Sequence, residues 1–173
     1  IYAAESTVYR TAGILNDMME SLPGDHSGQV LANGIAEYAL ECSLEKVFAS
    51  EVEGFVVDEA VQIHGGYGYI AEYPVERLYR DARIRRIFEG TNEINRTIIP
   101  TTLIKRAGSG ALPLIEESAG LIEKLKAHEV WPARETPGDI VQACKDVFLF
   151  CIGHGHQKLA DKLLKNQEIL GHL

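Results

Sequence analysis

The spacing of hydrophobic residues follows a helical period along almost the whole chain. Apolar residues three or four positions apart form one face of a helix from Tyr2 to Leu22, and a polar loop follows over residues 23–28. A second apolar stripe begins near Val30 and continues to His64. Ser50 with Glu53 matches a capping box, which would divide this stripe into two helices. Because no glycine or proline stands at that join, we predict one long helix, which the pair Gly65-Gly66 ends.

Later helices are predicted from their start and stop signals. Pro74 suits the first position of a short helix, since its missing N–H needs no partner there. A further helix begins after Thr91, and Pro100 inside it predicts a kink or break. Beyond a hinge at residues 108–110, a helix spans residues 112–128. Thr136 caps a last helix that extends to about residue 170.

Together these segments predict an all-α fold, an antiparallel bundle of long helices with an additional helical extension at the C-terminal end. The division falls at the glycine-rich hinge. We expect residues 1–107 to form the bundle and residues 108–173 to form the extension, which we interpret as incomplete. The chain also opens in mid-helix, without a methionine or a cap, and we interpret it as a piece of a longer protein.

Composition and charge exclude several classes of protein. Of the 173 residues, 46% are hydrophobic and 24% are charged, as in ordinary globular proteins. A net charge of −8 argues against nucleic acid as a partner, because phosphate binding requires a basic surface. The three cysteines are widely spaced and odd in number, which favours free thiols, and Cys144 and Cys151 are expected to be buried. Neither a targeting segment nor a membrane span is visible.

Candidate chemistry gathers in residues 61–99. Glu89 stands between Phe88 and Gly90, which predicts a carboxylate partly shielded from water and therefore a stronger base once deprotonated. The alternative is a surface residue that pairs with Arg85 or Arg86.

Other motifs in this stretch are less specific. The run of residues 65–68, Gly-Gly-Tyr-Gly, fits a phosphate cradle or a simple turn, and it follows a helix, unlike a dinucleotide fingerprint. A cluster of five arginines fits either a site for one anionic group or a solvated face that pairs with Glu72, Glu76 and Asp81. We call it the arginine cluster, and it consists of Arg77, Arg80, Arg83, Arg85 and Arg86. His154 and His156 are two residues apart on a helix and make a poor metal pair, so no metal site is predicted.

Two long motifs resemble those of one known family. The segments AVQIHGGYGYIAEYPVERLYRDARI and RIFEGTNEI, in this order and spacing, are similar to the C-terminal helical domain of acyl-CoA dehydrogenases. The segment YAAESTVYRTAG, and FEGT with phenylalanine before the glutamate, resemble the very-long-chain type and its bacterial relatives most. The resemblance is close over residues 1–107 and looser over residues 108–173.

This resemblance implies a flavoenzyme that oxidises fatty acyl-CoA to trans-2-enoyl-CoA. Glu89 matches the family's catalytic base, which removes a proton from Cα while a hydride leaves Cβ for FAD. Gly90 matches a backbone contact to the substrate. Residues that match FAD contacts are Gln62, Ile63, His64, Gly65 and Gly66, which meet the FAD of a neighbouring subunit, and Thr91, Asn92 and Glu93.

The resemblance also implies partners and a compartment. FAD shared between subunits implies a homo-oligomer, and the electron acceptor would be an electron-transferring flavoprotein. The compartment would be the bacterial cytoplasm or, in a eukaryote, the mitochondrial matrix. The isolated fragment is expected to be inactive and without FAD, because the family's other two domains supply most contacts. The alternatives are an acyl-CoA oxidase fragment and a non-catalytic helical oligomerisation module.

Overall fold

The computed structural model describes residues 1–24, 27–127 and 136–173, with the side chain of residue 161 left aside. All regular elements among them are helices, and these residues contain no β-strand, which confirms the all-α prediction. The chain divides into two compact units, Ile1–Ile99 and Pro100–Leu173. The described helices include none that is long and apolar enough to cross a membrane.

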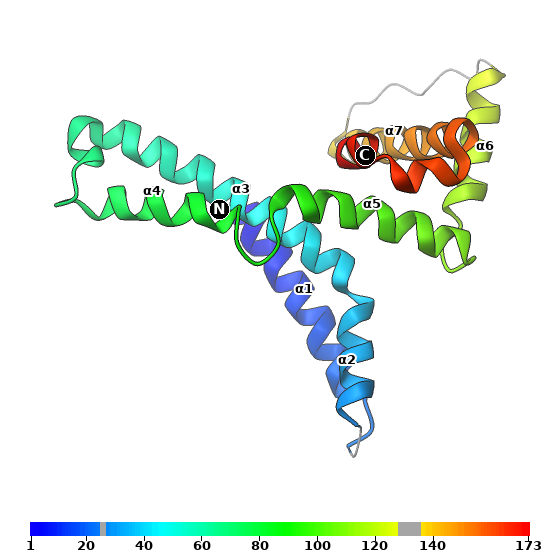
Figure 1. The fold of residues 1–173 in the computed structure, drawn as a ribbon, viewed down its shortest axis with the longest axis horizontal. Helices are drawn as coiled ribbons and strands as arrows, with labels where there is room; N and C mark the ends of the chain where they lie inside the picture. The colour runs from blue at the N-terminus through cyan, green and yellow to red at the C-terminus, as the bar shows by residue number, and fades with distance from the viewer. Residues whose placement is uncertain (25–26, 128–135) are drawn as a thin grey trace. The chain divides into compact units, whose positions relative to one another are not determined.

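The first unit begins with two helical hairpins (Figure 1). In the first, α1 (Tyr2–Ser21) lies beside α2 (Gly28–Glu37) and the beginning of α3 (Ala39–His64). Gly34 permits the close approach of α2, since a Cβ there would lie 2.6 Å from the sulfur of Met18. Ser27 caps α2 by accepting a hydrogen bond from the N–H of Val30.

The prediction of one helix from residue 30 to His64 is wrong at a single residue. Tyr38, with φ −98° and ψ 14°, separates α2 from α3. Its N–H donates to Ile35 O at 3.0 Å, an i to i−3 bond that tightens the last turn of α2. Tyr38 is neither glycine nor proline, so the local sequence carries no signal for this break.

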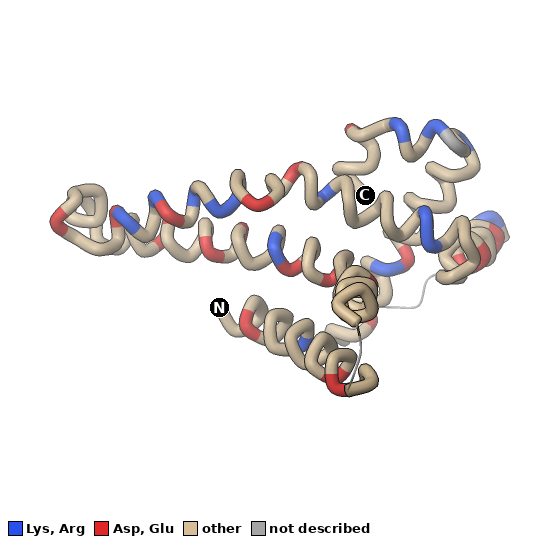
Figure 2. The backbone as a smooth tube through the Cα atoms, turned by 60° about the horizontal axis from the view of Figure 1, so that its bottom comes forward, with Lys and Arg blue, Asp and Glu red and all other residues tan. Residues whose placement is uncertain are grey.

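In the second hairpin, α3 returns through a 3₁₀ turn, η1 (Gly65–Tyr69), into α4 (Pro74–Arg85). Pro74 starts α4 as predicted. The two helices pack along their length, with Ala82 only 1% exposed. The charged residues of this hairpin are mainly acidic on α3 and mainly arginine on α4 (Figure 2).

Helix α5 (Asn92–Gly108) begins in the first unit and continues past Ile99 into the second. A kink or break was expected at Pro100; no break occurs, since the helix runs through this residue, which is less than 2% exposed. Burial of the ring within a packed helix offsets the hydrogen bond that proline cannot donate.

The second unit contains α6 (Leu114–Lys126), α7 (Pro137–Leu159), the 3₁₀ segment η2 (Ala160–Lys165) and α8 (Gln167–His172). Helix α6 packs on α7 where Gly153 crosses Ser118, because a Cβ at residue 153 would lie 2.7 Å from that of Ser118. The most buried large side chains in this unit belong to Ile152, Leu163 and Leu170.

The start of α7 was predicted correctly and its end was not. Thr136 and Asp139 form a full capping box around Pro137. The helix stops at Leu159 rather than near residue 170, because Ala160 adopts φ 44° and turns the chain into η2. The three cysteines are free, as predicted, but all are exposed, so the expected burial of Cys144 and Cys151 is wrong.

Candidate active site

Glu89 lies in the short loop, residues 86–91, that joins α4 to α5. The N–H groups of Ile87 and Phe88 donate to Ile84 O at 2.8 and 3.1 Å and close the end of α4. The N–H of Asn92 reaches back to Arg86 O at 3.0 Å and closes the loop from the other side. Both helix ends therefore hold the loop, and Glu89 is placed at its turn.

The backbone of Glu89 is strained. Its φ is +52°, and Gly90, which follows, has φ +87°. Glycine adopts such angles freely, whereas for a residue with a side chain this left-handed conformation costs of order 1–3 kcal/mol of folding free energy. Residues held in this way cluster at functional sites, which makes Glu89 the strongest candidate among the charged residues of the first unit.

The first turn of α5 provides the other side of the loop. Thr91 caps the helix, because its Oγ1 accepts a hydrogen bond from the N–H of Ile94 at 3.1 Å. The pKa of the Glu93 carboxyl is lowered by a hydrogen bond from its own backbone N–H and by the hydroxyl of Thr91, with smaller contributions from Arg83 and Lys46. A helix N-terminus favours negative charge in the same way.

A polar cluster, which we call the Asn92 cluster (half-buried Lys46 with buried Ser50 and Asn92), anchors this turn to α3. Asn92 is 3% exposed, and its Oδ1 accepts a 2.6 Å hydrogen bond from Lys46 Nζ. Its Nδ2 donates to Ser50 Oγ at 3.0 Å. Next to the cluster, Arg96 contacts both carboxylate oxygens of Glu51, at 2.7 and 2.9 Å. The start of α5 is thus fixed to α3 by hydrogen bonds far apart in sequence.

Glu89 lines a pocket of about 470 Å³ with Lys46, Ser50, Glu53, Arg85 and Phe88. The predicted shielding of Glu89 is not present in this chain, because Glu89 is exposed and Phe88 is 46% exposed. A residue's neighbours in sequence do not cover it unless the fold brings their side chains over it. Arg85, a possible partner in the surface interpretation, pairs with Glu53 on α3.

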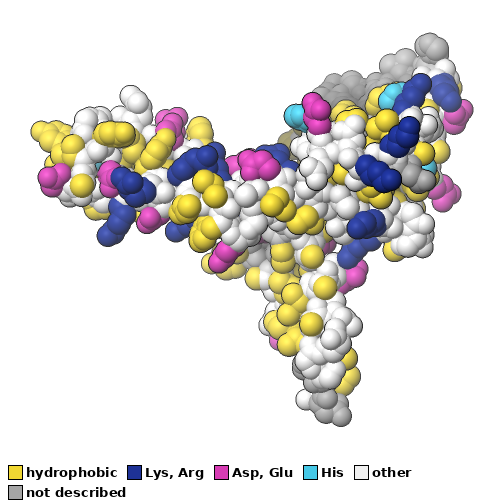
Figure 3. Space-filling model, in the orientation of Figure 1, with side chains coloured by type: hydrophobic (Ala, Val, Ile, Leu, Met, Phe, Trp, Pro, Cys, Tyr) yellow, Lys and Arg dark blue, Asp and Glu magenta, His cyan; other side chains and the backbone are white. Residues whose placement is uncertain are grey.

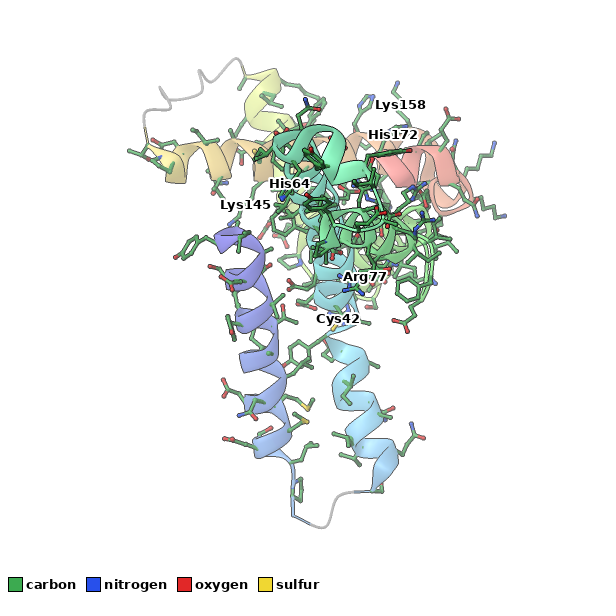
Figure 4. All side chains as sticks on the ribbon, turned by 90° about the vertical axis from the view of Figure 1, so that its left-hand side faces the viewer. Cys42, His64, Arg77, Lys145, Lys158 and His172 are labelled. Carbon is green, nitrogen blue, oxygen red and sulfur yellow. The ribbon has the colours of Figure 1, made fainter. Side chains whose placement is uncertain are left out.

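The predicted segment Gln62–Gly66 lies at the opposite end of the α3–α4 hairpin. Helix α3 ends at His64, which Figure 4 labels, and Gly65 with φ +60° follows as its C-cap. The ring Nδ1 of His64 lies 2.8 Å from Ala60 O. No heavy atom lies within 4 Å of where a Cβ on Gly65 or Gly66 would be. This backbone is therefore open to close approach by a flat or anionic group.

Large apolar side chains are exposed at this tip of the hairpin (residues 62–69). Ile63 is 82% exposed, Tyr67 64% and Tyr69 79% (Figure 3). Gly68, in contrast, is buried, because a Cβ there would lie 2.8 Å from Val61 O. A tip with fixed backbone and exposed apolar side chains is typical of a contact surface.

The structure does not bring the two candidate segments together within one chain. Helix α4, which separates them, has 12 residues. At 1.5 Å per residue the tip and the Glu89 loop are therefore about 18 Å apart.

The arginine cluster is largely a charged outer face of α4. Arg80 Nη2 lies 2.7 Å from Glu76 Oε1, and this hydrogen bond raises the pKa of the guanidinium. The pairing with Glu76 was predicted. Among the residues that the structure describes, no group of three or more His, Cys, Asp or Glu side chains is arranged to hold a metal ion.

Sequence reasoning missed Asn95, which supports the Glu89 loop, and Lys46 and Ser50, which anchor the start of α5. Lys46 and Ser50 belong to α3 and lie 46 and 42 residues before Asn92. In the sequence, Lys46 and Ser50 look like other polar residues of a long helix. No local signal therefore shows that they contact the start of α5. Asn92 was predicted to lie near the cofactor, but its amide is directed into the Asn92 cluster.

Comparisons with known proteins identify the family. The model described as "Acyl-CoA dehydrogenase, C-terminal domain" matches residues 1–104. A probable acyl-CoA dehydrogenase of Bacillus subtilis (strain 168) is 49% identical over 180 residues, which cover 98% of this chain and 30% of that protein. The chain belongs to the acyl-CoA dehydrogenase family, which confirms the resemblance read from its motifs.

Two further relatives extend this result. The crystal structure of an acyl-CoA dehydrogenase complexed with FAD from Bacillus anthracis matches with a TM-score of 0.88 and 48% identity, and covers 98% of this chain and 30% of that chain. The human mitochondrial very long-chain specific acyl-CoA dehydrogenase is 41% identical over 93 residues, which are 54% of this chain and 13% of that protein. The chain thus spans about a third of the length of the relatives that it matches throughout.

Proposed function

We propose that this chain is the C-terminal part of a flavin-dependent enzyme that oxidises fatty acyl-CoA to trans-2-enoyl-CoA, with Glu89 as the catalytic base. The observation that carries the proposal is the backbone of Glu89, a charged residue with φ +52°. Hydrogen bonds from both neighbouring helices hold its loop. Family membership supports the same reaction class.

In this mechanism Glu89 takes the proton from the carbon next to the thioester. This proton is only weakly acidic, so the base must be held in place and the thioester oxygen must receive hydrogen bonds. The backbone N–H of Glu89 would donate one of them. Bound FAD supplies the hydride acceptor for the β-carbon. Gly90 would let the substrate approach the backbone closely, since it has no side chain.

The residues present fit a role in holding FAD at two places. At the hairpin tip, Gly65 and Gly66 offer open backbone, and Gln62, Ile63 and His64 lead into it. Near the base, Thr91 and Glu93 occupy the start of α5, with the side chain of Asn92 committed to α3.

The tip and the Glu89 loop would then serve different flavins. Because about 18 Å separates the two segments, we infer that the tip meets the flavin of a neighbouring subunit. Its exposed Ile63, Tyr67 and Tyr69 support such a contact, and they imply a homo-oligomer.

The remaining parts of the proposal concern the whole protein. This chain on its own is expected neither to retain FAD nor to turn over. An electron-transferring flavoprotein would reoxidise the flavin, whereas an acyl-CoA oxidase, the alternative, would form hydrogen peroxide without it. The Bacillus relatives favour the bacterial cytoplasm over the mitochondrial matrix.

The decisive experiment replaces Glu89 by glutamine in the full-length protein that carries this chain. The amide keeps the shape of the side chain but cannot accept the proton. Positioned general bases contribute 10²–10⁴-fold, so acyl-CoA oxidation should fall by roughly 10³-fold or more with FAD content unchanged. The assay is acyl-CoA-dependent reduction of an artificial electron acceptor. Activity near that of the wild type would refute the base assignment and favour a non-catalytic oligomerisation module.

A further inference from the structure

Asn95 joins the Glu89 loop to the first turn of α5 by two side-chain hydrogen bonds. Its Nδ2 donates to Gly90 O and to Thr91 O, both at 3.0 Å. The backbone N–H of Asn95 also donates to Thr91 O at 3.0 Å. Asn95 is 8% exposed, so water competes little for these bonds. One buried side chain therefore holds the carbonyls of both residues that follow Glu89.

These hydrogen bonds lie beside the strained backbone of the Glu89 loop. Glu89 and Gly90 both have positive φ, and a loop of this kind relaxes toward ordinary angles unless its peptide planes are fixed. The carbonyls of Gly90 and Thr91 define two such planes. A Cβ on Gly90 would lie 3.1 Å from Asn95 Nδ2, so the amide packs directly against the loop. The Asn92 cluster, in contrast, fixes helix α5 rather than the loop.

We propose that Asn95 is a positioning residue, which holds the loop so that the carboxylate and the N–H of Glu89 face the substrate together. It acts through Glu89 and does not touch the reacting atoms. This inference rests on the proposed function, because it presumes that Glu89 is the base. Small displacements of a catalytic group lower the rate of the chemical step more than they lower substrate binding.

The experiment uses two variants of the full-length, flavin-loaded enzyme, Asn95→Leu and Asn95→Asp. Leucine keeps the size of the side chain and removes the donor, while an ionised carboxylate accepts and cannot donate. Flavin reduction is followed at its visible absorbance after rapid anaerobic mixing with acyl-CoA. We expect the limiting rate to fall about tenfold in both variants at neutral pH, while flavin content stays unchanged and the acyl-CoA dissociation constant changes less than twofold.

Acidic pH separates the two variants. A protonated carboxyl donates a hydrogen bond again, so the rate of Asn95→Asp relative to the wild type should recover partly as the pH is lowered. Asn95→Leu should show no recovery. Taking each rate relative to the wild type at the same pH cancels the titration of the base itself. The matched control is Ser118→Ala, which removes another buried side chain that bonds to the backbone, with Oγ 2.9 Å from Ile115 O. It should leave the rate unchanged.

Each failure is distinguishable. Wild-type rates in both Asn95 variants, with Glu89→Gln inactive, overturn the positioning role and leave the base assignment intact. A fall in rate that only matches a loss of bound flavin, or equal recovery of both variants in acid, also overturns the positioning role. If Glu89→Gln reduces its flavin at the wild-type rate, the proposed function itself fails, whatever the Asn95 variants do.

Discussion

The two ends of α4 hold irregular backbone in different ways. At the Glu89 loop, side-chain hydrogen bonds add to those of the backbone and fix the conformation. Asn95 binds the loop carbonyls and the Asn92 cluster binds the start of α5. At the hairpin tip there is little polar support, and the shape follows from steric contact of Gly68 with the last turn of α3. The loop is therefore organised from within the chain, whereas the tip presents exposed apolar groups.

This contrast agrees with the roles proposed for the two segments. A catalytic base must be held in one orientation before the substrate arrives, so its supports belong to the same chain. A surface that meets another subunit's cofactor gains its full set of contacts only on assembly. Changes at the loop should therefore affect stability through lost hydrogen bonds, and changes at the tip through crowding.

The largest expected effect on stability is at Asn92. Asn92→Leu removes the buried amide of the cluster, so half-buried Lys46 Nζ loses its acceptor and Ser50 Oγ, which keeps its hydrogen bond to Val47 O, loses its donor. Each polar group that is left without its hydrogen-bond partner lowers the free energy of unfolding by about 1–3 kcal/mol. The total decrease should therefore be about 3 kcal/mol. Urea denaturation followed by far-ultraviolet circular dichroism measures it.

A matched control for this change is Asn33→Leu. Asn33 is exposed and accepts a hydrogen bond from Gln29 within its own helix. Its replacement should change the free energy of unfolding by less than about 0.5 kcal/mol. Equal effects at Asn33 and Asn92 would contradict the view that the cluster anchors α5.

The tip should respond to volume rather than to polarity. Gly68→Ala places a methyl group 2.8 Å from the carbonyl oxygen of Val61, a backbone atom that cannot move without unwinding the end of α3. Overpacking of this kind lowers the free energy of unfolding by about 2 kcal/mol. Gly66→Ala, two residues earlier, meets no heavy atom within 4 Å and should be nearly neutral. The same urea assay compares them, and a tolerated Gly68→Ala would show that the tip adapts.

The smallest effect is a pH dependence at Glu93. Its pKa is lower in the folded chain than the usual 4.5, so the ionised form stabilises the fold. This contribution is present above about pH 4.5 and disappears as the pH falls through the lowered folded value. Glu93→Gln should therefore lower the melting temperature slightly at neutral pH and not at low pH. The effect should be small because the carboxyl is on the surface. A difference in melting temperature that persists unchanged at low pH would show that ionisation of Glu93 is not its cause.

Local signals in the sequence predicted much of the fold. Pro74, the N-cap Thr136 and the glycine at residue 65 each act on their own turn of helix, and all three lie where expected. The break at Tyr38 and the turn at Ala160 were missed, because neither residue type favours them. Long-range packing, rather than propensity, selects such conformations.

The candidate site was predictable only in part. The motifs around Glu89 and the tip predicted the correct family. They did not predict that Glu89 is exposed, because its exposure depends on side chains that the local sequence does not specify. The hydrogen bonds around Asn92 join residues 42 to 46 positions apart. No periodic pattern carries information about such pairs.

At residue 89 the requirements of stability and of the proposed activity conflict, because Glu89 has a left-handed backbone conformation. Glycine at residue 89 would relax the backbone and stabilise the chain by roughly 1 kcal/mol, yet it would delete the proposed base. A library selected for thermal stability alone would therefore enrich Glu89→Gly. Such a library would become more robust while losing catalysis, so any effort to stabilise this domain should keep residue 89 fixed.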